Sequence, residues 1–316
     1  MPTDNAPRIA IVIPVFNEEP VMQELFKRLG AVFSGDATVD WSVIMVDDGS
    51  KDRSGQLIEA KAARDPRYGL VSLSRNFGHQ AAIMAGLERA ADEGVDAAIT
   101  MDADLQDPPE LISELVARWR EGSEVVLAVR RSRREQGLRR MGFDLFHRGF
   151  NYLTDFRIVS NTGTFGLLGR EALEALVSLP ERHRFFPGIR AWVGFATAEV
   201  LYDRQERAAG KPAQTFVRLV RYALDGIFSF SYLPLRLMTY VGLVISGLSL
   251  VLATFFIVRR LLGVEVAFTG FTTLVTLTLF IGGVQLLGIG VIGEYLARVY
   301  DEVKQRPLYV VRKKKK

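Results

Sequence analysis

Short apolar runs alternate with longer stretches of helical pattern through the N-terminal part of the chain. The apolar runs show no period of two, which is typical of strands buried on both faces of a parallel sheet. Strands separated by helical patterns indicate an α/β fold, with a mostly parallel sheet flanked by helices. The pattern predicts strands at 9–15, 41–46, 70–73, 97–101 and 125–129.

Two helices are predicted between these strands. One is capped by Asn17 and runs to about Leu29, and the other covers 80–91. The pattern is more mixed beyond residue 130. There we expect a strand at 163–168, a helix at 170–179 and a strand at 197–202.

Two long uncharged runs occupy 237–258 and 266–293. A helix over the first run would be about 33 Å long at 1.5 Å per residue, enough to cross a hydrocarbon core of about 30 Å. Core helices of a soluble protein are the alternative, but such helices rarely stay uncharged for more than about 14 residues. We therefore expect two transmembrane helices.

An amphipathic segment precedes the first uncharged run. In 216–228, apolar residues recur at helical spacing and charged residues take the opposite face, as in a helix lying in a membrane interface. An ordinary amphipathic helix on a soluble core is the alternative. The predicted organisation is an α/β domain at 1–212, a juxtamembrane amphipathic helix at 213–232, a transmembrane hairpin at 233–298 and a basic tail at 299–316.

Charge is concentrated at the C-terminal end. The net charge is +4, and positive residues crowd the end of the chain at 312–316 rather than forming a nucleic-acid-binding face. Nothing at the N-terminus resembles a signal peptide. Because positive residues favour the cytoplasmic side, both termini are expected there, although Arg259 and Arg260 in the outer link oppose this orientation.

The absence of cysteine excludes disulfides and thiolate metal sites. Two acidic residues, Asp102 and Asp104, follow the fourth predicted strand on a loop expected to be exposed. Their side chains should share a side, and they would repel each other unless a cation is present. A hard divalent ion such as Mg²⁺ or Mn²⁺ satisfies this pair, with a solvated loop as the alternative. Just beyond them, Asp107 and Glu110 are predicted to form a helix-capping box.

The second predicted strand ends in Asp47 and Asp48, which suit ribose hydroxyls or base edges. A turn in which Ser50 or Asp52 caps the next helix is the alternative, and both can hold together. No glycine-rich phosphate loop follows the first strand, which argues against a dinucleotide enzyme. A G-x-G-x-x-G match at 288–293 lies inside the second uncharged run, where small residues are typical of helix packing.

Several motifs together resemble the family 2 glycosyltransferases with a GT-A fold, and more closely the bactoprenol glucosyltransferases and dolichyl-phosphate mannose synthases. The resemblance rests first on 11–19 (IVIPVFNEE), 46–50 (VDDGS), 74–78 (SRNFG) and 102–109 (DADLQDPP). It continues through 181–185 (ERHRF), 191–195 (AWVGF), 202–204 (YDR) and 225–226 (DG), and then through the two uncharged runs.

The resemblance implies a metal-dependent, inverting enzyme at the cytoplasmic face of the cell membrane. It would move a hexose, by default from UDP-glucose, onto a polyprenyl phosphate such as undecaprenyl phosphate, and homo-oligomerisation is left open. The roles implied are metal binding by Asp104 and Gln106, a ribose contact from Asp102, phosphate neutralisation by Arg130 and Arg133, and a nucleotide pocket lined by Pro14, Phe16, Glu18 and Asp48. A solvated basic loop is the alternative for the arginines.

Two segments depart from the family pattern. Where many members carry acids and an arginine in D-x-G-D-F-R-L, this chain has Asn161, Thr164 and Gly166. A later Gly-x-Ser-Lys is replaced by a segment containing Pro212. A non-catalytic or weakened membrane homologue is therefore the main alternative. A polysaccharide synthase is the less favoured one, because no Gln-x-x-Arg-Trp motif is present.

Overall fold

The structure of the protein is a computed structural model that describes residues 6–131, 159, 161–182, 185–203, 233–262 and 270–313. The chain divides into two compact units. The first comprises Met1–Ala223 together with Arg306–Lys316, and the second comprises Leu224–Gln305. The predicted amphipathic helix at 213–232, Arg133 and Pro212 lie outside the described residues.

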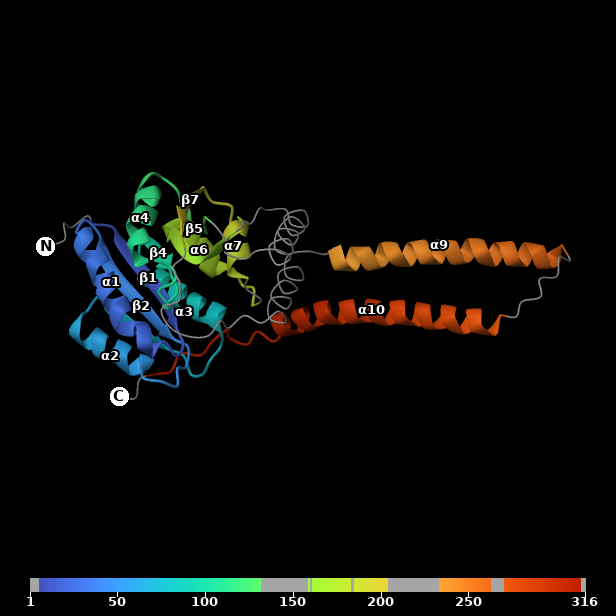
Figure 1. Ribbon diagram of the computed structural model, residues 1–316, viewed down its shortest axis with the longest axis horizontal. Helices are drawn as coiled ribbons and strands as arrows, with labels where there is room; N and C mark the ends of the chain where they lie inside the picture. Colours follow the sequence, from blue (N-terminus) through green and yellow to red (C-terminus); the bar gives the residue numbers. More distant parts are fainter. Residues whose placement is uncertain are drawn as a thin grey trace. The chain divides into compact units, whose positions relative to one another are not determined.

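The first unit is built on a seven-stranded sheet with the order β3-β2-β1-β4-β6-β5-β7 (Figure 1). Its strands are β1 (Arg8–Val15), β2 (Asp40–Asp47), β3 (Tyr68–Ser72), β4 (Ala97–Thr100), β5 (Val125–Arg130), β6 (Thr162–Gly169) and β7 (Thr197–Tyr202). Only β6 runs antiparallel to its neighbours among these strands. The predicted α/β class and the mostly parallel sheet are therefore confirmed, and the expected strands differ from the observed ones by a few residues at their ends.

Helices cover both faces of this sheet (Figure 1). The strands β1 and β4 are buried along almost their whole length, which is why their sequences are uniformly apolar. One face packs against α1 (Met22–Gly35), α2 (Ser54–Arg64) and α4 (Ile112–Arg120). The other packs against α3 (His79–Asp92), α6 (Arg170–Ser178) and α7 (Phe186–Trp192).

The first helical segment begins differently from the prediction. A short 3-10 helix, η1 (Glu19–Val21), precedes α1, and no side chain caps either of them. Asn17 has a positive φ of 56°, and its Oδ1 accepts a hydrogen bond from the Lys51 N–H at 2.8 Å. The predicted Asn17 cap is wrong because this side chain is used to join two loops.

The second unit contains two long apolar helices, α9 (Leu233–Leu261) and α10 (Phe271–Val303), drawn in orange and red in Figure 1. Each is long and apolar enough to cross a membrane, and none of the residues in their most apolar windows is buried. The two predicted apolar helices are thus observed. The link between them, 263–269, lies outside the described residues.

The end of the chain belongs to the first unit. After α10, the backbone of Val311 pairs in an antiparallel bridge with Leu73, the residue that follows β3. The described residues 306–313 therefore belong to the same unit as the sheet, whereas the sequence pattern had suggested only a basic tail. The bridge lies at an edge of the sheet, because β3 is an edge strand.

Candidate active site

The polar residues singled out in the sequence meet at one edge of the sheet. The neighbouring parallel strands β2, β1 and β4 all end there, at Asp47, Val15 and Thr100. Because β6 is antiparallel, its first residues reach the same edge. In open α/β sheets this edge, beyond the carboxyl ends of the strands, is where ligands bind.

Asp102 lies two residues beyond β4 and is held from two sides. Its Oδ1 accepts a hydrogen bond from the Thr164 hydroxyl at 3.0 Å and lies 3.4 Å from Nε2 of His79. The sheet register explains the first contact. Thr100 pairs with Gly166 in antiparallel strands, so a residue two positions after Thr100 faces one two positions before Gly166.

Asp104 is 7% exposed, so the expectation of an exposed loop acid is wrong. Its Oδ1 accepts the N–H of Gln106 at 3.1 Å, and Leu105 between them adopts a positive φ of 59°. This tight turn folds the loop back on itself beneath the acid. The side chain is therefore fixed by local backbone geometry, which suits a ligand that must hold its position.

The acidic loop carries oxygen ligands of the kind that a divalent ion takes. Among the described residues, no group of three or more His, Cys, Asp or Glu side chains could hold an ion by itself. Carboxylate oxygens of Asp102 and Asp104 and the amide oxygen of Gln106 are nevertheless the hard ligands that Mg²⁺ and Mn²⁺ take. Since Mg²⁺ usually binds through one or two carboxylates plus waters and substrate phosphates, this donor set fits such an ion.

Asp48 is buried and accepts two backbone hydrogen bonds from the loop after β3. Its Oδ1 takes the N–H of Phe77 at 2.7 Å and its Oδ2 takes the N–H of Gly78 at 2.9 Å. Burial raises the pKa of Asp48, and these two donors lower it in part. The carboxylate thus joins the end of β2 to residues 73–78, which we call the β3–α3 loop.

Gly49 lets the two loops approach. It has a positive φ of 71°, and a Cβ at this position would lie 2.7 Å from the carbonyl carbon of Arg75. A side chain there would be both strained and in collision with backbone. The contact between the loop after β2 and the β3–α3 loop therefore requires glycine.

Three of the residues that the resemblance places in a nucleotide pocket lie at the end of β1 or just after it. Pro14 is buried within the strand, whereas Phe16 is 42% exposed just beyond it. Glu18 donates its backbone N–H to the Ser54 hydroxyl at 2.9 Å. Asp52 Oδ1 accepts the Ser54 N–H at 3.0 Å in the turn before α2, but no side chain caps this helix, so the predicted capping is wrong. These bonds tie the loop after β1 to the start of α2.

Arg130 ends β5 and belongs to a buried polar group with Tyr202 and Asp107. Its Nε donates to the Tyr202 hydroxyl at 3.1 Å, and its guanidinium lies 3.8 Å from Asp107. Tyr202 in turn donates its proton to Asp107. Burial raises the pKa of Tyr202, with the Asp107 charge adding to the effect, so the phenol stays neutral and can serve as both donor and acceptor.

The predicted capping box at Asp107 and Glu110 is wrong. No side chain caps the 3-10 helix η2 (Pro109–Leu111), because Asp107 turns inward to Tyr202. Glu110 instead binds the guanidinium of Arg28, with its Oε1 accepting the Nε–H at 2.9 Å. Both acids bind partners in distant parts of the chain instead.

The sequence matches a known protein family over most of the residues that form this site. The model of the family described as glycosyl transferase family 2 matches residues 10–177, which include the ends of β1, β2, β4 and β5. The chain belongs to this family. It is therefore a glycosyltransferase, and the resemblance read from its motifs is confirmed.

Relatives align with nearly the whole chain. An uncharacterized glycosyltransferase of Synechocystis is 46% identical over 96% of this chain and 94% of its own. The SfII prophage-derived bactoprenol glucosyl transferase of Shigella flexneri is 41% identical over 97% of this chain and 98% of its own. A prophage bactoprenol glucosyl transferase homolog of Escherichia coli is 38% identical over 98% of this chain and 100% of its own.

For this family 2 member, the structure explains one departure from the family pattern. At Gly166, a Cβ would lie 2.6 Å from the Val126 carbonyl oxygen and 3.1 Å from a guanidinium nitrogen of Arg190. Arg190 is 4% exposed and donates a hydrogen bond to the Gly163 carbonyl at 3.1 Å. A buried arginine of α7 thus fills the space beside β6 where a side chain at 166 would begin.

Sequence reasoning missed several members of this site. His79 belongs to no metal-binding pattern in the sequence, yet it lies beside Asp102. The contacts of Tyr202 with Asp107 and of Thr164 with Asp102 were not predicted, although Tyr202 occurs in a segment that the resemblance covers and Thr164 in one that departs from the family pattern. These residues could have been predicted only from their positions near strand ends that face the acidic loops.

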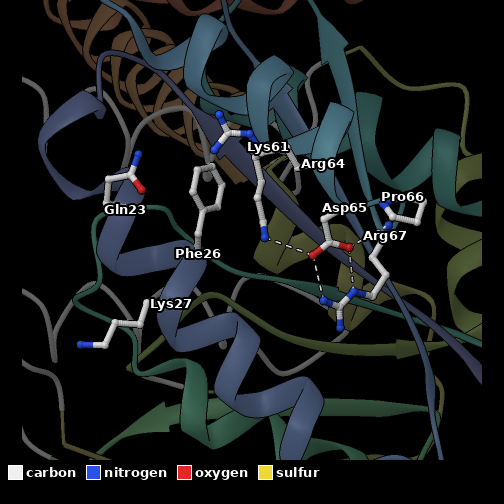
Figure 2. Close-up of a pocket in the computed structure, with 8 residues that line it drawn as sticks. All are labelled: Gln23, Phe26, Lys27, Lys61, Arg64, Asp65, Pro66 and Arg67. Atoms are coloured by element: carbon white, nitrogen blue, oxygen red, sulfur yellow. Dashed lines mark hydrogen bonds and ion pairs between the residues drawn. The ribbon is translucent and has the colours of Figure 1, made fainter.

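A surface hollow elsewhere on this unit is a poor candidate for the active site. It lies where α2 ends and β3 begins, at the amino ends of the strands, and is lined mainly by charged side chains (Figure 2). Its central acid, Asp65, is bound by Arg67 at 2.8 Å and Lys61 at 3.1 Å. Arg67, and then Lys61, hold the pKa of Asp65 below its usual value, so the acid of this hollow is already bound by two of its cations.

Proposed function

We propose that this protein transfers a hexose, by default glucose from UDP-glucose, to a polyprenyl phosphate at the cytoplasmic face of the cell membrane. The observation that carries the proposal is the 41% identity to a bactoprenol glucosyl transferase across 97% of the chain, which includes both apolar helices as well as the sheet domain. A lipid phosphate acceptor would account for the presence of both the sheet domain and the two apolar helices in one chain.

The donor is proposed to lie along the ends of β1, β2 and β4. Phe16 offers an exposed ring for the base, and Asp102 lies where a ribose hydroxyl could be bound. Asp104 and Gln106 would hold Mg²⁺ or Mn²⁺, which supplies positive charge beside the departing nucleoside diphosphate. The turn around Leu105 keeps these two ligands in fixed relation.

The acceptor chemistry accounts for the missing acid at Thr164. The second pKa of a phosphate monoester is about 6, so its attacking oxygen is mostly anionic at neutral pH and needs no general base. It attacks the anomeric carbon as the bond to the diphosphate breaks, with inversion. Arg130, held by Tyr202, together with Arg133, would balance the phosphate charge and position the oxygen.

The direct test is a transfer assay on membranes that contain the protein. With radiolabelled UDP-glucose and added undecaprenyl phosphate, label should enter a short lipid in the presence of Mg²⁺ or Mn²⁺. Excess chelator should remove the activity and the divalent ion should restore it. Label in a polymer would indicate a polysaccharide synthase, and no label with any nucleotide-sugar would indicate a non-catalytic homologue. Full activity in excess chelator would contradict the metal proposal.

The proposed orientation in the membrane can be tested by labelling single cysteines from outside the cell. The chain contains no cysteine, so single cysteines introduced at Gly263 and at Lys316 report only their own positions. The first should react with an impermeant thiol reagent added to intact cells, and the second should react only after lysis, because positive residues favour the cytoplasmic side. The reverse labelling pattern would overturn the orientation proposed.

A further inference from the structure

The end of the chain is attached to both sides of the β3–α3 loop, residues 73–78. At its start, the Ser74 N–H donates to the Val310 carbonyl at 2.8 Å, and the Arg312 N–H donates to the Ser72 carbonyl at 2.7 Å. Beyond the loop, the Tyr309 hydroxyl donates to the carboxylate of Glu88 on α3. Residues 309–312, which we call the C-terminal segment, therefore connect the strand before the loop with the helix after it.

This attachment depends on backbone bonds rather than on burial. Val310 and Val311 are 48% and 46% exposed, so the C-terminal segment adds little apolar surface to the core. The segment pairs instead with the edge of the sheet, where β3 has no further strand beside it among the described elements. Added edge strands are held mainly by main-chain hydrogen bonds. Loss of the segment should therefore loosen the loop locally and leave the core folded.

The loop that it holds contributes to the candidate donor site. The N–H groups of Phe77 and Gly78 bind the Asp48 carboxylate, and the backbone at Arg75 packs on Gly49. A displaced β3–α3 loop would leave the buried Asp48 carboxylate without these two donors. An ionised carboxylate that loses its hydrogen bonds in a buried position is costly, so the loops at the ends of β2 and β3 would rearrange together.

We propose that the C-terminal segment is a positioning element of the donor site, which holds the β3–α3 loop so that Phe77 and Gly78 fix Asp48. The assignment of Asp48 to donor binding rests on the proposed function, whereas the support of the loop does not. The segment lies in the sequence a few residues beyond the end of α10, so a part of the chain remote from the motifs of the sheet domain would complete the nucleotide side of the site.

The test uses the full-length protein in detergent, with Arg312→Pro as the variant and Arg312→Ala as its control. Proline removes the N–H that bonds to Ser72, whereas alanine keeps it and loses only the side-chain contact with the Ser74 carbonyl at 3.4 Å. Amide hydrogen exchange of Phe77 and Gly78 should rise about tenfold in Arg312→Pro and stay within about twofold in Arg312→Ala. Exchange of the core strand β1 should not change in either variant.

Donor binding supplies the second measurement. The dissociation constant for UDP with Mn²⁺, measured by calorimetry, should rise about fivefold in Arg312→Pro, while the KM for undecaprenyl phosphate stays the same. Tyr309→Phe, which removes the hydroxyl bound to Glu88 but no backbone bond, should give a smaller change in the same direction. It keeps the proposal testable if Arg312→Pro does not fold.

The outcomes separate the two proposals. Unchanged exchange at Phe77 and Gly78 in both Arg312→Pro and Tyr309→Phe would overturn the support of the loop. Faster exchange with unchanged UDP binding would overturn the role in donor binding. If the wild type binds no UDP, the proposed donor is wrong, and the exchange measurement still decides whether the C-terminal segment holds the loop.

Discussion

Asp104→Asn is expected to lower the rate of sugar transfer by roughly a thousandfold while the protein stays folded. A loss of this size is typical when an enzyme loses one main electrostatic contact that stabilises the transition state. Asparagine keeps the oxygen that accepts the Gln106 N–H, so the turn around Leu105 is preserved. What disappears is the negative charge that would hold a divalent ion beside the diphosphate. Because the side chain is buried, an alanine would confuse this loss with a cavity and an unpaired N–H.

The matched control for Asp104→Asn is Asp92→Asn, which removes an exposed acid at the end of α3, far along the sheet from the acidic loop. It should transfer sugar at the wild-type rate. The comparison is made from initial rates at saturating Mn²⁺ and from melting temperatures. An Asp104→Asn protein that melts like the wild type and retains more than about a tenth of its activity would show that Asp104 is no metal ligand.

Much of the fold could be predicted because its signals are local. Strands buried on both faces, such as β1, need uninterrupted apolar residues, and uncharged runs as long as those in α9 and α10 are rare outside membranes. The candidate site followed from the same reasoning. The acids that follow β2 and β4 lie at the same end of the sheet, because both strands run parallel to β1 between them.

Local rules failed where a side chain binds a residue that is distant in the sequence. Asp107 has the right spacing for a helix cap, but Tyr202, 95 positions away, donates to it in the core. Asn17 likewise bonds to Lys51 across two loops instead of capping a helix. The pairing of Thr164 with Asp102 depends on β6 being antiparallel, and that direction has no signature in a short apolar run.

The C-terminal segment shows the same limit more strongly. The consecutive basic residues that begin at its last position and continue to 316 indicate only a solvated tail. Nothing in the pattern at 309–312 specifies a partner strand, since the pairing of edge strands is set by main-chain groups that every residue carries. The structure was needed to show that this segment adjoins the loop that holds Asp48.

Many family members carry an acid at the position of Thr164, and replacing Thr164 with aspartate tests whether this chain needs one. The Thr164 hydroxyl donates to Asp102 at 3.0 Å, so Thr164→Asp would replace a donor with a second carboxylate at hydrogen-bonding distance. Two carboxylates so close cannot both ionise freely, and the pKa of one of them must rise. At pH 7 the repulsion would push Asp102 away from its observed position.

Thr164→Asp is therefore expected to reduce kcat/KM for the sugar donor about tenfold at pH 7, not to activate the enzyme. The ratio of variant to wild-type activity should rise as pH falls, because a proton shared by the two carboxylates relieves their repulsion, while titration of the phosphate acceptor affects both proteins alike. Thr164→Ser keeps the hydroxyl donor and should match the wild type within about threefold. An increase of about a hundredfold in Thr164→Asp would instead mean that the reaction needs a general base and that this chain is a weakened relative.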